Sequence, residues 1–174
     1  ASLLMRFVSN PPEALLDSLC PYFEGKEPFR GLGLPSLSEN YDWPINLASL
    51  KDKCPRLELS KEPSNFQKNI LLKKMSPKLW ACGNHLEWAK WAVATWGGIK
   101  GNKSETLEGY VSDIDAGIYP NALKGVASYS KILSFMNPQE YAIYDARVAI
   151  SLNAVQLLSG AKAGVIFPYL PGRN

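Results

Sequence analysis

Residues 123–148 read LKGVASYSKILSFMNPQEYAIYDARV. A tight turn at 123–127, with Gly125 at its centre, leads into a helix predicted over residues 128–136, which Asn137-Pro138 ends. The start of such a helix directs backbone N–H groups and the positive end of its dipole outward, which suits a phosphate oxygen. A plain connection between two helices fits the same residues, so this turn alone leaves both interpretations open.

The second half of this stretch ends on a single carboxylate. Residues 141–144 are predicted to be extended, and Asp145 begins a helix over 145–158 that Gly160 closes. Asp is a favoured N-cap residue, so one interpretation is that Asp145 caps this helix and has no further role. An anion held at this position beside a sugar C1′ would also stabilise the positive charge that develops as a base leaves, or activate a water.

Lys131 is the amine in this stretch that could take part in chemistry. It lies fourteen positions before Asp145, so a helix–loop–helix could bring the two side chains together. A partly desolvated lysine near a carboxylate can act as an amine nucleophile. A solvated helix lysine, or a structural ion pair with Asp145, is the alternative interpretation.

The rest of the chain indicates further helices and one irregular arm. The predicted elements are a helix opened by Pro11-Pro12-Glu13 with Asn10 as N-cap and ending near Pro21, an ordered but irregular arm over 25–60, a helix over 64–75, a second from Ser76-Pro77 to Trp96 ended by Gly97-Gly98, and one capped by Ser104. No strand alternation is sustained. We expect one mainly α domain over 1–174, with the N-terminal helix and the ordered arm in 1–60, a helical core in 61–160 that contains the hairpin 123–128, and an irregular tail in 161–174.

A tryptophan-rich segment falls within that helical core. Trp88 and Trp96 share one side of the predicted helix with His85 and Ala92. An aromatic stripe at this spacing is typical of a core. Trp88 and Trp91 are also the kind of side chain that stacks on an extruded base.

The composition excludes several classes of protein. The 174 residues are 46% hydrophobic and 20% charged with a net charge of +3, which excludes a disordered, collagenous or coiled-coil chain. No stretch reaches the roughly 20 apolar residues of a membrane span. Cys20, Cys54, Cys82 and the single His85 form no zinc or iron–sulfur pattern, so we expect reduced, mostly buried thiols in a cytoplasmic protein without a metal or cofactor.

Taken together, one set of residues resembles the helix-hairpin-helix DNA glycosylase superfamily: Gly125-Val126-Ala127, Ser130-Lys131, Leu133, Phe135, Pro138, Tyr141, Ile143 and Asp145. The resemblance covers about residues 88–158 and is strongest to the bacterial group labelled 8-oxoguanine-glycosylase-like. In departure from the family pattern, Lys124 and Ala127 replace the hairpin proline and second glycine. Tyr129 stands where bifunctional members carry their Schiff-base lysine, so Lys131 serves only if the register shifts by two residues.

The resemblance implies cleavage of the N-glycosidic bond of a damaged or modified base in DNA after base flipping, by a protein expected to be monomeric. Asp145 and Lys131 would be catalytic. The implied DNA-binding residues are Lys124, Gly125, Val126, Ala127, Ser128 and Arg147, and the implied base contacts are Trp88, Trp91 and Tyr129.

Two alternatives stay open, a DNA-binding module without chemistry and a helical domain that binds another protein through its tryptophan-rich face. The near-balance of charge predicts a small DNA footprint with a shallow salt dependence.

Overall fold

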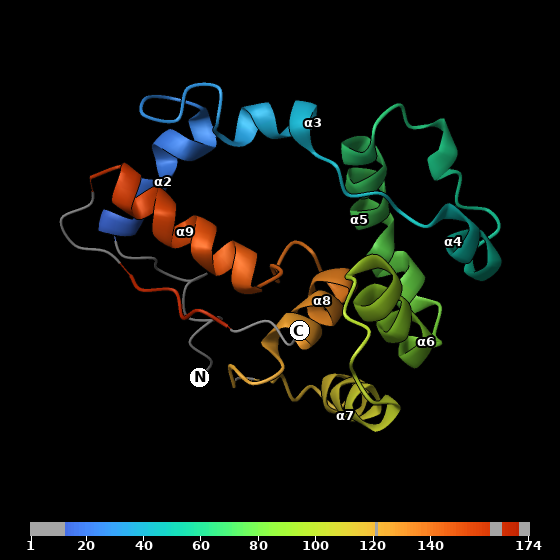
Figure 1. Cartoon of the computed structure of the whole chain (residues 1–174). Coiled ribbons are helices and arrows are strands. Elements are labelled where there is room, and N and C mark those ends of the chain that lie inside the picture. The colour runs from blue at the N-terminus through green and yellow to red at the C-terminus, as the bar shows by residue number, and fades with distance from the viewer. Residues whose placement is uncertain (1–12, 121, 161–164, 171–174) are drawn as a thin grey trace. The chain divides into compact units, whose positions relative to one another are not determined.

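The structure is a computed structural model that describes residues 13–120, 122–160 and 165–170. Within these ranges the chain is helical or irregular and contains no strand, which confirms the mainly α class (Figure 1). The expected N-cap Asn10, with Pro11 and Pro12, lies outside the described residues, and so do 161–164 and 171–174 of the expected tail.

The chain divides into two compact units, each assembled from separate parts of the sequence. Unit 1 takes the described residues of 1–40, 121–124 and 144–174, and unit 2 takes 41–120 and 125–143. The segment 61–160, expected to form the helical core, is therefore divided, because its residues 144–160 belong to unit 1.

Unit 1 is built on two helices that lie side by side, α2 (Glu13–Glu24) and α9 (Ala146–Leu158) (Figure 1). The short helices η1 (Leu34–Ser36) and α3 (Leu37–Asn40) complete its helical part. Its core consists of apolar side chains from both long helices and from the segment after α2, namely Leu15, Leu19, Phe29 and Val155.

The segment 165–170 is irregular, as expected, but side-chain amides of α9 hold it in place. The Asn153 amide donates to Phe167 O at 2.8 Å and accepts from Phe167 N at 2.9 Å. Gln156 forms the same pair of bonds with the backbone of Val165, at 2.9 and 2.8 Å. Two amides one helical turn apart thus satisfy backbone groups that a neighbouring strand would otherwise pair with.

The first helix does not end near Pro21, and this expectation is wrong. α2 includes Pro21 and continues to Glu24. A proline inside a helix removes one intrahelical hydrogen bond, yet tertiary packing can hold the turn that follows. Here Tyr22 packs edge-on against the buried Phe29, with ring centroids 5.6 Å apart, and so ties the last turn of α2 to the core.

The arm over 25–60 is ordered, as expected, but less irregular than the sequence suggests. Besides η1 and α3 it contains α4 (Leu47–Lys53) and η2 (Leu59–Lys61). Asn46 caps α4 by accepting a hydrogen bond from Ser49 N at 3.1 Å. The apolar residues that anchor this arm are buried: Phe29, Ile45, Leu50 and Leu59.

Unit 2 surrounds one central helix, α8 (Val126–Met136), in which every residue except Ala127 and Met136 is buried. Its neighbours include α5 (Asn65–Ala81), α6 (His85–Lys90) and η3 (Trp91–Trp96), while α7 (Ser104–Asp115) packs on α6 (Figure 1). The ring of Phe135 from α8 stacks on Trp88 at 5.4 Å and lies 6.1 Å from Trp91. These rings form the aromatic centre of unit 2.

The helix boundary expected at Ser76-Pro77 is absent, and α5 runs from Asn65 through Pro77 to Ala81. Pro77 has no N–H to donate to the carbonyl four positions earlier, which is that of Lys73. The Ser76 hydroxyl, itself fully buried, donates to Lys73 O at 3.1 Å instead. A side chain thus supplies the bond that the proline removes, and the helix continues.

The predicted continuous helix up to Trp96 is interrupted at Gly83 and Asn84. Both residues have positive φ, +90° and +59°, and they separate α5 from α6. Beyond α6, residues 91–96 form a π-helix, η3, which Gly97 ends by donating to Ala92 O at 2.9 Å. The expected end of this segment at Gly97-Gly98 is confirmed.

Two helix starts differ slightly from those expected. Ser104 is the first residue of α7 and Lys103 precedes it as the cap. α8 begins at Val126, two residues earlier than predicted, because Val126 packs in the core and is only 1% exposed. The expected closure of α9 by Gly160, which has φ +72°, is confirmed.

Candidate functional site

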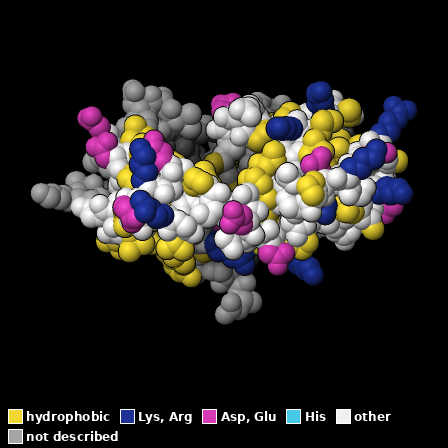
Figure 2. Space-filling view, turned by 90° about the horizontal axis from the view of Figure 1, so that it is seen from above, with side chains coloured by type: hydrophobic (Ala, Val, Ile, Leu, Met, Phe, Trp, Pro, Cys, Tyr) yellow, Lys and Arg dark blue, Asp and Glu magenta, His cyan; other side chains and the backbone are white. Residues whose placement is uncertain are grey.

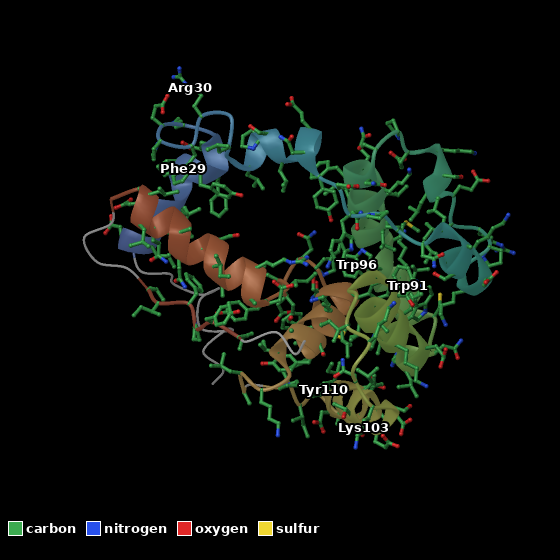
Figure 3. All side chains as sticks on the ribbon, in the orientation of Figure 1. Phe29, Arg30, Trp91, Trp96, Lys103 and Tyr110 are labelled. Carbon is green, nitrogen blue, oxygen red and sulfur yellow. The ribbon has the colours of Figure 1, made fainter. Side chains whose placement is uncertain are left out.

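The glycine turn before α8 is present, and Gly125 fits it for two physical reasons. Gly125 has φ +80°, a conformation that strains other residues. A Cβ atom on Gly125 would also collide with the Tyr110 hydroxyl and would lie 3.1 Å from Tyr110 Cζ. The phenol of Tyr110, on α7, therefore covers the turn (Figure 3).

Ser128 serves the interior of unit 2 and not its surface. Its side chain is buried, its hydroxyl accepts from Asn102 Nδ2 at 2.9 Å, and its N–H donates to Gly125 O at 2.9 Å. The phosphate contact expected of Ser128 is replaced by a structural role, because both polar groups bind protein atoms. The residues of the turn with exposed or partly exposed surface are Lys124, Gly125 and Ala127, while Val126 is buried.

The three aromatic side chains expected to contact a base are core residues. Trp88 is 6% exposed, Trp91 2% and Tyr129 2%. Trp91 Nε1 donates to Ser49 Oγ at 3.0 Å, and burial, followed by the nearby Tyr110, raises the pKa of Tyr129 to about 12. Rings packed in this way present no open face on which a base could stack, so the expected base contacts are corrected.

Lys131 lies in the interior of unit 2. It is 5% exposed, and its Nζ donates to Ala127 O at 3.1 Å. The side-chain methylenes of Lys131 pass close to Gly97, where a Cβ atom would lie 2.8 Å from Lys131 Cε. A π-helix has a wider turn than an α-helix and often occurs at functional sites. Here η3 ends on the glycine that leaves room for the Lys131 side chain.

Lys73 is a second amine beside Lys131, and no sequence pattern indicated it. Its Nζ donates to Ser134 O at 3.0 Å and also binds Ser134 Oγ. The same Nζ lies 4.9 Å from the centroid of the Trp96 ring, a cation–π distance. Burial first, and the positive charge of Lys131 second, lower the pKa of Lys73 to about 8.

Trp96 is held firmly under this amine by a chain of hydrogen bonds. Trp96 Nε1 donates to Asn69 Oδ1 at 2.8 Å, and Asn69 Nδ2 donates to Trp43 O at 2.9 Å. Trp43 Nε1 in turn donates to Trp96 O at 2.8 Å. The ring beneath Lys73 is therefore fixed from both its side chain and its backbone.

Asp145 caps α9 in unit 1, which confirms the capping interpretation. Its Oδ1 accepts from Arg147 N at 3.0 Å and from Val148 N at 3.1 Å. The carboxylate is partly buried, whereas Arg147 is exposed. The structure thus places Lys131, Gly125 and Ser128 together in unit 2, and Asp145, Arg147 and Lys124 in unit 1.

The remaining polar groups of the described residues do not form a metal site. Among the described residues, no group of three or more His, Cys, Asp or Glu side chains could hold a metal ion. His85 stacks on Trp80 at 4.5 Å and binds Asp115 at 2.8 Å. The thiols differ from the expectation of burial, because Cys20 and Cys82 are exposed and Cys54 is partly exposed.

Comparisons with protein-family models, curated proteins and solved structures give no match to this chain. The resemblance to the helix-hairpin-helix glycosylases accordingly remains an expectation carried by the residues quoted for it. Within the described part of the chain, none of the helices has the length and hydropathy needed to cross a bilayer.

Proposed function

We propose that this protein is a DNA glycosylase that releases a damaged or modified base after the nucleotide is extruded from the duplex. The observation that supports it best is the Asp145 carboxylate, which two backbone N–H groups hold at the start of α9. Along the chain it follows the Gly125 turn and the buried helix α8, the order that the resemblance requires.

The proposed role of Asp145 follows from its geometry. The helix N-terminus favours the anionic form of a side chain placed there, and the two bonds to Oδ1 fix the orientation of the carboxylate. A fixed anion stabilises the positive charge that develops on the sugar as the base leaves, or orients an attacking water. Capping and catalysis use the same arrangement.

The proposed DNA contacts are few. The backbone N–H groups of Gly125, Val126 and Ala127, in unit 2, would donate to a phosphate oxygen at the start of α8. Lys124 and Arg147, which are exposed residues of unit 1, are proposed as separate phosphate contacts. On the face shown in Figure 2, Lys and Arg side chains are interspersed with Asp and Glu and form no continuous basic surface. This distribution supports a small footprint and a shallow salt dependence.

The test is base release from duplexes that carry oxidised, alkylated or otherwise modified bases. Asp145→Asn keeps a capping oxygen but removes the charge, so we expect a folded variant that loses about a hundredfold or more of the activity. Asp17→Asn removes an exposed carboxylate of α2 and should release bases like the wild type. The proposal fails if the folded wild type releases no base across the panel, or if Asp145→Asn is as active as the wild type.

A further inference from the structure

A hollow of about 230 Å³ lies on unit 2, between the end of η2 and the N-terminal part of α5, and is called the α5 groove below. Its lining combines an apolar wall with polar and charged residues: Glu62, Phe66, Gln67, Ile70, Leu71 and Lys74. Sites that take up drug-sized ligands usually have volumes of roughly 300–1,000 Å³. A smaller, open hollow of this kind fits one large side chain of a binding partner, as pockets for anchor residues do. The volume therefore favours a docking site for a peptide segment over a small-molecule site.

The apolar wall of the α5 groove is ordered and in contact with solvent. The Phe66 ring packs edge-on against Tyr41, with ring centroids 5.7 Å apart. Ile70 is 42% exposed although it lies within a long helix, and Leu71 beside it is partly exposed. A wall that is already held in place loses little conformational freedom on binding, and covering it removes apolar area from water.

Gln67 gives the α5 groove a hydrogen-bond donor for a peptide backbone. Its Oε1 accepts from Ser64 Oγ at 3.1 Å, and its backbone N–H donates to the same hydroxyl at 3.2 Å. These bonds orient the Gln67 amide, whose Nε2 donates to no other described residue. An N–H group presented in this way can donate to a backbone carbonyl of a bound peptide.

The charged side chains decide which kind of peptide fits. Lys74 lines the groove, and Lys78 lies one helical turn further along α5. Both lysines are exposed, and no ion pair within the described residues involves either of them. α5 contains four lysines and no acidic residue, whereas Glu62 precedes its first turn. The groove is therefore basic toward the C-terminal side and acidic at its N-terminal end.

We propose that the α5 groove binds a segment of a partner protein in which one large apolar side chain is flanked on one side by two or more acidic residues. The apolar side chain fills the hollow against Ile70 and Leu71, and a backbone carbonyl beside it accepts from Gln67. The acidic residues lie over Lys74 and Lys78. The other flank of the segment is neutral or basic, because the carboxylate at the N-terminal end of the groove repels a negative charge.

The first test selects the peptide chemistry directly. A phage-displayed library of random short peptides is depleted on the Ile70→Ser/Lys74→Glu variant and then selected on the wild-type full chain. We expect the enriched peptides to share one large apolar residue flanked on one side by Asp or Glu. Enrichment of basic peptides, or the absence of a common motif, would overturn the proposal.

Binding of an enriched peptide, followed by fluorescence anisotropy, then measures each contact. Lys74→Glu combined with Lys78→Glu should raise the Kd at least about tenfold, and Ile70→Ser should do the same. Lys100→Glu and Ile118→Ser are the matched controls, because they change exposed residues of the same types in unit 2 that do not line the groove. The controls should bind like the wild type, and an unchanged Kd in the groove variants would contradict the assignment.

A peptide of reversed charge separates recognition from loss of folding. Basic residues replace its acidic ones, so it should bind the Lys74→Glu/Lys78→Glu variant at least about tenfold more tightly than it binds the wild type. If that variant keeps the wild-type circular dichroism spectrum and Tm but prefers the original peptide, the two lysines do not select the charge of the partner and the proposal fails.

Other occupants of the α5 groove give different results. A dimer of the wild type in sedimentation equilibrium that is lost in Ile70→Ser would identify a second copy of the chain and overturn the proposal of a partner protein. Binding to vesicles of phosphatidylcholine and phosphatidylserine that is lost in Lys74→Glu/Lys78→Glu would overturn it in favour of a lipid surface.

The inference is independent of the proposed function, because the α5 groove contains none of the proposed catalytic or DNA-binding residues. Ile70→Ser should therefore release bases like the wild type. Peptide selection without base release by the wild type would reject the proposed function alone. Base release without an apolar and acidic peptide motif would reject this inference alone.

Discussion

Gly97→Ala tests whether the Lys131 side chain is packed as the structure shows. Gly97 has φ −82°, which any residue can adopt, so the substitution adds bulk without backbone strain. The new methyl group would lie 2.7 Å from Ala92 O and 2.8 Å from Lys131 Cε. The buried lysine chain, which also meets the new methyl group at Lys131 Cδ, can shift only in part, and the Ala92 carbonyl moves only with the backbone of η3.

The expected cost is that of overpacking a filled site, about 1–3 kcal/mol of unfolding free energy. For a chain of this length that corresponds to a decrease in Tm of roughly 2–12 °C. Urea and thermal unfolding followed by circular dichroism would measure both quantities. Gly109→Ala is the matched control, because Gly109 is exposed in α7 and a methyl group added there would have no atom within 4 Å, and it should stabilise by about 0.5–1 kcal/mol.

A double-mutant cycle separates the two collisions. In a Lys131→Ala background the contact with the lysine chain is gone and only Ala92 O remains, so Gly97→Ala should cost less there than in the wild type. An effect of Gly97→Ala below about 0.5 kcal/mol, or an equal cost in both backgrounds, would refute the close packing of Lys131 on Gly97.

Three further predictions follow from single contacts. Ser76→Ala removes the hydroxyl that donates to Lys73 O beside Pro77 and should lower the unfolding free energy by about 1 kcal/mol in urea melts, and no change would refute that role. Asp145→Ala should cost about 1 kcal/mol through the lost N-cap while Asp145→Asn costs little, and equal Tm values for the two variants would contradict the capping geometry. The folded pKa of Lys73, about 8, lies below its ordinary 10.5, so the unfolded chain binds more protons between these values and Lys73 should make stability rise with pH across this window. Lys73→Met should remove that rise in urea melts from pH 7.5 to 9.5, and an unchanged pH profile would reject the shift.

Local signals in the sequence predict much of unit 2 and the start of α9. Asp145 caps α9 by accepting hydrogen bonds from the backbone N–H groups two and three residues further along the chain. Gly125 adopts a positive φ, which its own residue type allows. Such features depend on a few consecutive residues, so a pattern of capping and turn residues is sufficient to find them.

The wrong predictions share a different cause. Pro21 and Pro77 break helices by local rules, but the ring contact of Tyr22 and the hydroxyl of Ser76 overcome those rules. Gly83-Asn84 carries a turn signal, which the apolar period on both sides obscures. Local sequence therefore predicts the right element types and misplaces several of their ends.

Lys73 could not be identified from the sequence because its environment is assembled from distant segments. Ser134 lies 61 positions along the chain, and Trp96 is fixed through Asn69 and Trp43. In the sequence Lys73 is one of two adjacent lysines in a helix, which is typical of a solvated surface. The aromatic stripe predicts a core position for Trp88, and the structure confirms it, with Phe135 from α8 against both Trp88 and Trp91. The burial of Tyr129 beside Tyr110 has no such local signal, because Tyr110 comes from another helix.

The π-helix η3 makes the number of residues between Trp91 and Gly97 critical. A π-turn corresponds to one extra residue in an α-helix, so deleting the exposed Thr95 would restore the α-helical repeat over 91–96. Each residue of an α-helix rotates the chain by about 100°, and the deletion would turn Trp96 and Gly97 away from Lys73 and Lys131 by that angle. Homologues of this chain should therefore tolerate substitution at position 95 but no insertion or deletion between Trp91 and Gly97.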